Sequence, residues 1–170
     1  MSTDPFDATA AAEDSGLEPR GDLPADPARA LLLLTCMDAR ILPHALFGLE
    51  IGDVHVLRNA GGRVTPDVLR SVLLSTRLMA VDQVVVLHHT RCGGGQSDRA
   101  LAAALREAGV EDPPTELYGA ADRVDALRAD LEALRSDPHL PDDLRTAGYV
   151  YDIDSGEVQP LAALEEPAPD

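Results

Sequence analysis

Lysine and tryptophan are absent from this chain of 170 residues, which contains two cysteines and five Phe or Tyr residues. All 14 basic residues are arginine, so chemistry that needs a lysine, such as a Schiff base or a nucleotide-binding P-loop, is excluded. Acidic residues outnumber basic ones and give a formal net charge of -16. Because phosphates are bound by a basic face, this charge argues against a nucleic acid or an anionic membrane as partner.

Long apolar runs are missing as well. No stretch reaches the roughly 18 residues of a membrane span, and the acidic N-terminus does not resemble a signal peptide. We therefore predict a cytoplasmic protein without a membrane partner. In a reducing compartment the two cysteines are expected as free thiols or metal ligands rather than as a structural disulfide.

The distribution of apolar residues predicts one domain between two acidic ends. With 45% hydrophobic residues, a chain of this length can bury a core without a disulfide or a metal to hold the fold. Residues 1–27 are rich in Asp, Ala and Pro without an apolar period, which predicts a mobile acidic N-terminal arm. A single α/β domain is expected over residues 28–160, followed by an acidic C-terminal tail over residues 161–170.

Short apolar runs alternate with helical patterns along the domain. This order predicts an α/β fold with a mostly parallel central β-sheet flanked by helices. Strands are predicted at Ala30–Thr35, Val54–Leu57, Gln83–His88 and within GYVYDI at 148–153. Helices are predicted from Pro66 to Met79 with Thr65 as N-cap, from Ser97 to Ala108, and within 118–136.

Two polar stretches follow predicted strands. In TCMDAR the residues Cys36, Asp38 and Arg40 alternate, so in an extended segment their side chains share one face and converge. In HHTRCGGG the residues His89 and Cys92 stand three apart, a spacing that can bind one metal through nitrogen and sulfur. Sites in open α/β sheets gather beyond the carboxyl ends of strands, where both stretches lie.

Two cysteines and a histidine form a ligand set that favours zinc, one ion per chain, with a fourth position left open as catalysis requires. The alternative is a pair of buried inert thiols, for which the polar surroundings are poorly suited. A phosphatase-type nucleophile would need a longer loop between Cys36 and Arg40, and a redox pair normally has two residues between its cysteines. A phosphate loop at NAGG or CGGG is a weak rival, because neither has the dinucleotide spacing and no lysine follows.

The stretches CMDAR, GDVHVLRNAGG and HHTRCGG, in this order and spacing, resemble the three successive motifs of the β-class carbonic anhydrases. The resemblance runs in detail from about Leu32 to Gly94 and more loosely to about Val158. It is closer to the compact microbial branch, because five aromatic residues cannot readily supply the aromatic pocket of plant-type members. It implies a zinc enzyme, a carbonate dehydratase, in which zinc-bound hydroxide reversibly hydrates carbon dioxide to bicarbonate and a proton. It also implies a homodimer or a dimer of dimers.

The resemblance assigns a role to each part of the site. It places the zinc ligands on Cys36, His89 and Cys92, and a catalytic dyad on Asp38 and Arg40. A bidentate contact from Arg40 would keep Asp38 ionised to orient the nucleophile, and without it Asp38 could take the fourth zinc position and close the site. The wall of the substrate site is predicted at Arg58, Asn59, Gly61, Gly62 and Gly93.

Two alternative functions and the roles of five further polar residues are also predicted. Relatives use the same zinc site to hydrolyse carbonyl sulfide or carbon disulfide, and a catalytically silent zinc-binding regulator is the third alternative. His88 is expected on the opposite strand face from His89, as a structural histidine. Arg91, between the ligands, would either favour bicarbonate or pair with the acidic surface. The surface or the edge of the core is expected for His44, His55 and His139.

Overall fold

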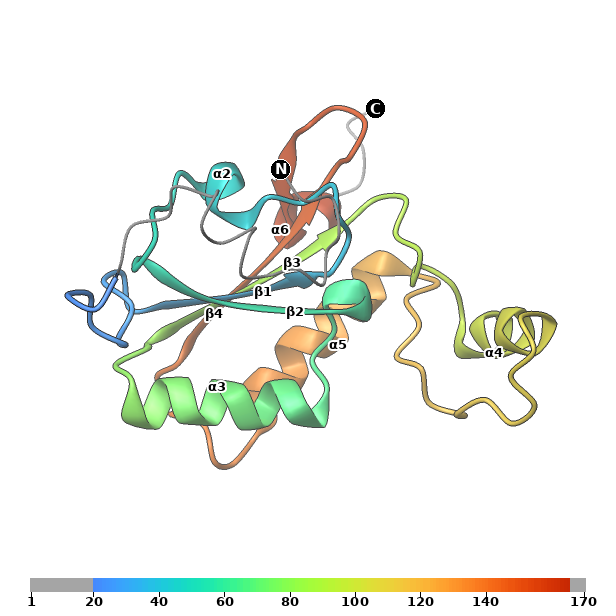
Figure 1. The fold of residues 1–170 in the computed structure, drawn as a ribbon, viewed down its shortest axis with the longest axis horizontal. Coiled ribbons are helices and arrows are strands. Elements are labelled where there is room, and N and C mark those ends of the chain that lie inside the picture. The colour runs from blue at the N-terminus through green and yellow to red at the C-terminus, as the bar shows by residue number, and fades with distance from the viewer. Residues whose placement is uncertain (1–19, 166–170) are drawn as a thin grey trace.

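The computed structural model describes residues 20–165 and contains, within them, a five-stranded sheet of order β2-β1-β3-β4-β5 (Figure 1). The first four strands in chain order are parallel and β5 is antiparallel to β4, which confirms the predicted mostly parallel sheet. The strands are β1 (Leu31–Cys36), β2 (Val54–Asn59), β3 (Gln83–His89), β4 (Arg145–Tyr151) and β5 (Val158–Pro160).

Four of these strands were predicted, with small shifts of their ends. Both β1 and β3 extend one residue further than expected, to Cys36 and His89. Each strand therefore ends in a predicted metal ligand. The strand β4 begins three residues before the expected segment, at Arg145. The short β5 has too few residues to show a period and was not predicted.

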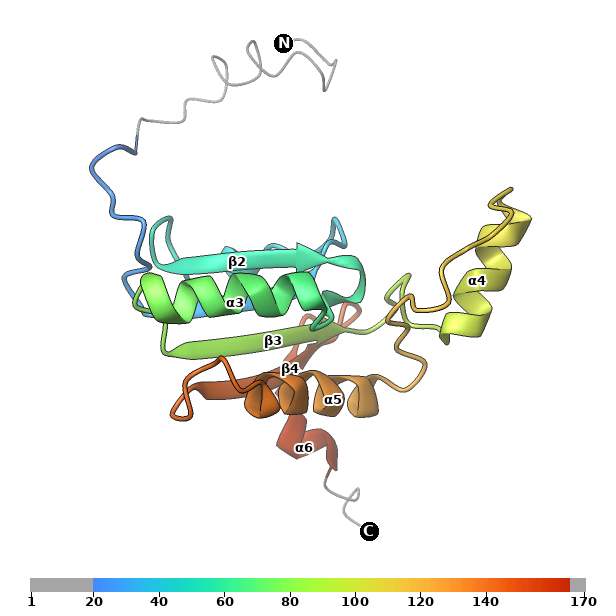
Figure 2. The same cartoon turned by 90° about the horizontal axis from the view of Figure 1, so that it is seen from below.

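Two long helices, α3 (Pro66–Leu78) and α5 (Arg123–Ser136), cover one face of the sheet (Figure 2). As predicted, the Thr65 side chain caps α3 by accepting a hydrogen bond from the Val68 backbone nitrogen. Apolar side chains of both helices pack on the sheet and form the larger core. Its fully buried members include Leu32, Leu34, Val72, Val84, Val86 and Leu127.

The other face of the sheet is covered by fewer residues, some of which come from a short helix. The short helix α2 (Pro43–Phe47) lies above it and contributes Leu46 and Phe47 to a second, smaller core around Leu33, Ile41 and Leu87. This helix was not predicted, since five residues are too few for a helical period. The smaller core includes Cys36, and Cys92 packs against it, so both polar motifs are in contact with packed apolar side chains.

A helical segment projects from the sheet at the carboxyl ends of the strands. The helix α4 (Asp98–Glu107) and the chain around it, residues 96–120, form what we call the α4 excursion (Figures 1 and 2). The Asp98 carboxylate joins its two limbs by accepting hydrogen bonds from the backbone nitrogens of Leu117 and Gly119, at 3.1 and 2.6 Å. The nitrogen of Ala120 donates to the carbonyl of Gly94 at 3.2 Å, so the segment returns to where it left the domain.

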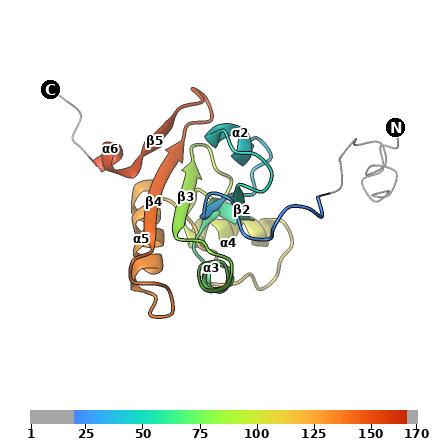
Figure 3. The same cartoon turned by 90° about the vertical axis from the view of Figure 1, so that its left-hand side faces the viewer.

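The two ends of the described chain pack against opposite edges of the sheet (Figure 3). Of the predicted mobile arm, residues 1–19 lie outside the described residues. Residues 20–27 contact the β2 side, where His55 Nε2 donates to the Ala25 carbonyl at 2.9 Å. The predicted tail does not begin at 161, because Leu161–Glu165 forms the helix α6, and Leu161 packs against the main core.

No helix between residues 20 and 165 has both the length and the apolar character that crossing a membrane requires.

Candidate metal centre

The sheet brings the two polar motifs together. The strands β1 and β3 are parallel neighbours, so Cys36 at the end of one lies beside His89 at the end of the other. The sulfur atoms of Cys36 and Cys92 are 3.8 Å apart. Together with a His89 ring nitrogen they lie within 4.8 Å of one another, which is close enough to share one metal ion. Cys36 and His89 are buried and Cys92 is half-buried.

His89 presents one ring nitrogen to the two sulfurs. Its Nδ1 donates to the Thr90 carbonyl at 2.9 Å, which fixes the tautomer and leaves a lone pair on Nε2. That Nε2 atom is fully buried and has no hydrogen-bond partner among residues 20–165. Buried polar atoms rarely lack a partner, so an unpaired nitrogen beside two thiols fits a site for zinc.

The pair of thiols loses its first proton readily and its second proton only with difficulty. The hydrogen bond from Cys92 lowers the pKa of Cys36 to about 4, while the same contact and burial raise the pKa of Cys92. A bound cation would be needed to release the second proton, because two adjacent thiolates repel each other. The donor set is therefore suited to a divalent metal that binds as thiol protons leave.

Asp38 and Arg40 form the predicted bidentate pair. Arg40 Nε donates to Asp38 Oδ1 at 2.9 Å and Arg40 Nη2 donates to Asp38 Oδ2 at 2.7 Å. This contact holds the pKa of the Asp38 carboxyl well below its usual range. Asp38 Oδ2 lies 3.9 Å from His89 Nε2, so the ionised carboxylate sits at the edge of the metal centre without replacing a ligand.

The way these residues converge differs from the prediction. An extended segment was expected from Cys36 to Arg40, but the chain turns at Ala39 and Arg40, where the Ile41 nitrogen donates to the Asp38 carbonyl at 3.0 Å. The Asp38 side chain also accepts a hydrogen bond from the Arg40 nitrogen at 3.0 Å. Aspartate favours such turns because its short carboxylate reaches backbone donors two residues ahead. This turn, and not strand alternation, therefore brings the Arg40 side chain to the Asp38 carboxylate.

Arg58 supports the same turn from β2. Its Nε donates to the Cys36 carbonyl at 3.0 Å and its Nη2 to the Asp38 carbonyl at 2.7 Å. The described contacts of this predicted substrate residue are thus with the backbone that carries a thiol and the carboxylate. Asn59 likewise binds backbone, since its side-chain amide pairs with both the nitrogen and the carbonyl of Arg63.

Two of the three predicted wall glycines lie against the metal-binding loops. Gly61 and Gly62 form a buried 3-10 turn, and both have positive φ, +83° and +69°. A Cβ on Gly62 would lie 2.9 Å from the backbone nitrogen of Cys36, so only glycine fits there. Gly93 differs, because it is exposed and a Cβ there would meet no atom within 4 Å in the part of the chain that the structure describes.

A buried charged cluster behind the metal centre was missed from the sequence. Asp130 Oδ2 accepts hydrogen bonds from Arg63 Nε at 2.7 Å and from His88 Nε2 at 2.9 Å, and its Oδ1 accepts one from the Val64 nitrogen. All three charged or titratable side chains are buried. The contact confirms His88 as a structural histidine. One signal was available: Asp130 interrupts the apolar face of α5 beside Leu131.

The remaining predicted polar residues have ordinary surroundings. The Arg91 guanidinium pairs with Asp154 at 2.5 Å, which bears out the pairing alternative for this residue. His55 lies at the core edge and contacts Ser75, His139 is exposed beside Asp137, and His44 is half-buried.

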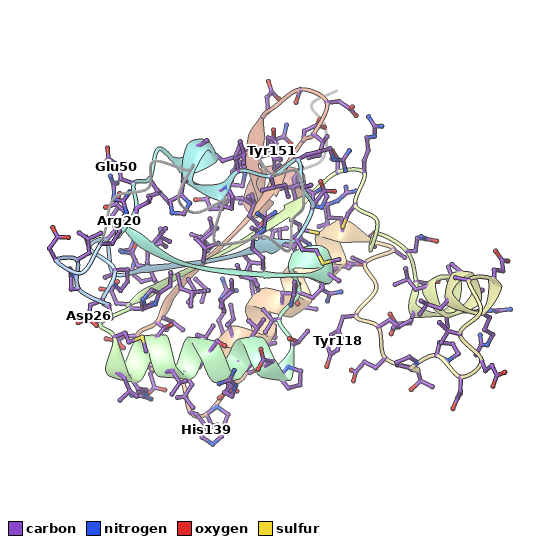
Figure 4. The ribbon with its side chains drawn as sticks, viewed as in Figure 1. Arg20, Asp26, Glu50, Tyr118, His139 and Tyr151 are labelled. Atoms are coloured by element: carbon purple, nitrogen blue, oxygen red, sulfur yellow. The ribbon has the colours of Figure 1, made fainter. Side chains whose placement is uncertain are left out.

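Two tyrosines labelled in Figure 4 come from distant segments of the chain. Tyr118 lies on the returning limb of the α4 excursion, and Tyr151 ends β4 beside His89. Tyr118 also helps to line a cavity of about 310 Å³ between that limb, the end of β2 and the start of α3. Of these two tyrosines, Tyr151 packs against the smaller core that includes Cys36, as Cys92 does.

Comparison with known proteins gives consistent results. A profile of the carbonic anhydrase family matches residues 31–158. Beta-carbonic anhydrase 1 of Mycobacterium tuberculosis is 33% identical over 141 residues, covering 82% of this chain and 86% of that protein. A carbon disulfide hydrolase of Acidithiobacillus thiooxidans is 28% identical over 156 residues, covering 78% and 77%. The crystal structure of a carbonic anhydrase from Streptococcus mutans has a TM-score of 0.83 at 34% identity, covering 95% of this chain and 99% of that one.

Proposed function

This chain belongs to the β-class carbonic anhydrases, and from that premise we propose that it is a zinc enzyme that interconverts carbon dioxide and bicarbonate. The observation that carries the proposal is the bidentate contact of Arg40 with Asp38 beside three converging ligand atoms. An inert thiol pair would need no ionised carboxylate at its edge. The enzyme class is accordingly a carbonate dehydratase, acting in the cytoplasm, where thiol ligands stay reduced.

The ligand set supports one zinc per chain. Cys36, His89 and Cys92 would hold the ion and leave one position open. When bound, zinc supplies a Lewis acid that makes water a nucleophile near neutral pH. The buried Nε2 of His89, which has no hydrogen-bond partner among residues 20–165, supports this proposal because its lone pair is available to the ion.

Asp38 and Arg40 have different roles in the proposed reaction. The Asp38 carboxylate would accept a hydrogen bond from the nucleophilic water at Oδ2 and thereby orient it toward the carbon atom of the substrate. Arg40 keeps that carboxylate ionised and holds it beside the ligand set, where it does not replace a ligand. Substrate contacts are proposed at the wall residues Arg58, Asn59, Gly61, Gly62 and Gly93.

The second candidate function is the hydrolysis of carbon disulfide or carbonyl sulfide. It is favoured by the relatives named carbon disulfide hydrolase, which are 28–29% identical to this chain. These substrates are linear molecules like carbon dioxide, so the dyad and the ligand set serve either reaction. A zinc-binding regulator without catalysis is disfavoured, because Arg40 holds Asp38 off the ligand atoms.

The test is a pair of rate measurements on zinc-loaded protein. Stopped-flow hydration of carbon dioxide is measured beside the release of hydrogen sulfide from carbonyl sulfide and carbon disulfide. Rapid hydration supports the proposal, and sulfide release without hydration selects the second candidate. Zinc-loaded protein that catalyses neither reaction would contradict both and favour the regulator.

We also propose a homodimer or a dimer of dimers. The strand β2 is an edge of the sheet, and its free backbone groups have no strand partner on the outer side among residues 20–165. Exposed edges of this kind are normally covered or paired in native proteins. A second copy is the partner that the family resemblance implies.

A further inference from the structure

Arg123 reaches the metal centre from outside all three sequence motifs. It is the first residue of α5, which is capped by the Asp122 side chain. The Nε atom of Arg123 donates a hydrogen bond to the backbone carbonyl of His89 at 2.9 Å. Since the His89 ring is held by its Nδ1 contact with Thr90, the backbone and the ring of this ligand each have a fixed partner.

The Arg123 side chain also forms part of the wall behind the ligands. It is half-buried and lines a cavity of about 10 Å³ together with His88, His89, Cys92 and Gly95. A cavity of this size holds about one water molecule at most. The guanidinium is therefore packed directly against the loop that runs from His89 to Cys92.

Arginines hold the carbonyl groups of both metal-binding segments. Arg58 binds the carbonyls of Cys36 and Asp38, and Arg40 Nη2 binds that of Arg91 at 3.1 Å. Arg123 supplies the corresponding contact at His89. These donors come from different elements, so each segment is fixed to a separate part of the fold.

We propose that Arg123 is a positioning residue of the metal centre. Its Nε hydrogen bond to the His89 carbonyl fixes the backbone from which His89 and Cys92 present their ligand atoms. This inference rests on the proposed zinc site and extends it to a residue on a helix. Partners that orient metal ligands typically contribute about 10–100-fold to metal affinity, and that is the loss expected without this bond.

Three substitutions separate the hydrogen bond from the charge. Arg123→Gln places an N–H donor the same number of bonds from the backbone as the arginine Nε, but removes the charge. Arg123→Lys keeps the charge and puts a methylene group at that position. Arg123→Met keeps the reach of the side chain and removes both. If positioning is the role, the glutamine variant binds metal like the wild type, while the lysine and methionine variants bind it more weakly.

The experiment measures metal binding directly on the full-length chain. Metal-free protein competes with a chromophoric chelator for zinc, and Co²⁺ is added separately so that its visible absorption reports the geometry of the ligand set. We expect the methionine and lysine variants to lose about 10–100-fold in zinc affinity and to show altered Co²⁺ bands. Arg70→Met is the matched control, because Arg70 forms an exposed pair with Asp67 on α3.

Several outcomes would overturn the inference. Wild-type affinity and an unchanged Co²⁺ spectrum in Arg123→Met would exclude a positioning role. Equal losses in the glutamine and methionine variants, with lysine unaffected, would assign the effect to charge instead. If Arg123→Met fails to fold, as judged by circular dichroism of the metal-free protein, the glutamine and lysine variants still decide. A wild-type chain that binds neither metal would overturn the zinc site itself, and this inference with it.

Discussion

At the scale of single residues, the proposed activity rests on the contact between Asp38 and Arg40. Asp38→Asn keeps the size of the side chain but removes the anionic acceptor, so we expect zinc to stay bound while turnover falls by about 10²–10⁴-fold. Stopped-flow rates and zinc content of the same preparation measure this. Asp154→Asn, which removes an exposed charge paired with Arg91, serves as the control. Full activity in folded, zinc-loaded Asp38→Asn would exclude a catalytic role for the dyad.

Gly62 has a second kind of importance, which is steric. Its φ of +69° disfavours any other residue by about 1–2 kcal/mol, and a Cβ would in addition press on the backbone of Thr35 and Cys36. Crowding of that kind costs about 1–3 kcal/mol more. We therefore expect Gly62→Ala to lower the free energy of unfolding by the sum of both effects, measured by urea denaturation.

Gly48 provides the comparison for that substitution. It has a similar φ of +58°, but a Cβ there would meet no atom within 4 Å in the described chain. Gly48→Ala should therefore show the conformational cost alone. Equal losses in the two variants would mean that the contact of Gly62 with β1 is unimportant.

The sequence predicted that Cys36, His89 and Cys92 lie together, as they do in the structure, but not how the chain beside them is arranged. Residue types and spacing identified Cys36, His89 and Cys92 as a ligand set, because soft sulfur and imidazole donors at strand ends have few other uses. The turn at Ala39 and Arg40 was missed, since a pattern of alternating polar residues does not distinguish a strand from a turn. Arg123 was missed because its partner is a backbone carbonyl, which leaves no trace in the sequence.

Among the helices, α5 carries a buried carboxylate whose ionisation supports the fold. Burial by itself raises the pKa of Asp130, but the hydrogen bond from His88 and the Arg63 guanidinium outweigh it and leave the pKa below its ordinary value. A folded-state pKa below the unfolded value of about 3.9 means that the contribution to stability is present above that pH. It is lost as the pH falls through the lower, folded-state pKa.

Asp130→Asn tests this contribution. Removing one charge from a buried pair costs about 3–5 kcal/mol, because the remaining charge has lost its partner. We expect a loss of that order at pH 7 and a weaker dependence of stability on pH below 4, both measured by denaturant titration. Asp67→Asn is the control, since Asp67 pairs with Arg70 on the surface of α3. An unchanged acid dependence in Asp130→Asn would contradict the assignment.

Elements were predictable where they are long and periodic. The stripes of α3 and α5 and the β-branched run of β3 gave their type, because burial on one face forces a period. The ends were nearly right for α3 and β3, whereas α5 begins at Arg123, five residues into the predicted stretch. The short elements α2, β5 and α6 were not found, since three to five residues show no period. They form because the packed sheet positions their few apolar side chains, such as Phe47 against Tyr149 at 6.3 Å between ring centroids.

At the scale of the whole molecule, binding of the proposed zinc would be coupled to folding. A ligand that binds the folded chain and not the unfolded one stabilises it by about 2.7 kcal/mol at a free concentration of 100 times its Kd. We therefore expect a chelator to lower the melting temperature in calorimetry, and added zinc to restore it. The Cys36→Ala, Cys92→Ala double variant should melt at the same temperature with and without zinc. A zinc-dependent melt in that variant would place the metal elsewhere.

Assembly is the other property of the whole molecule. With β2 at an open edge of the sheet, we expect a homodimer or a dimer of dimers in sedimentation velocity at micromolar protein. Deletion of residues 1–25 tests separately whether the N-terminal arm contributes to assembly. An active monomer in the same experiment would contradict the proposed assembly.

The hydrogen bonds at the base of the α4 excursion bear on how the length of this segment can change in evolution. Asp98 is hydrogen-bonded to Leu117, so the two ends of the intervening stretch are fixed side by side. The entropy of closing a loop grows only slowly with its length, so the number of residues between these positions has little effect on the rest of the fold. We therefore expect this stretch to tolerate insertions and deletions, so that the helix could be lengthened, shortened or replaced while the loops that carry Cys36 and His89 keep their geometry.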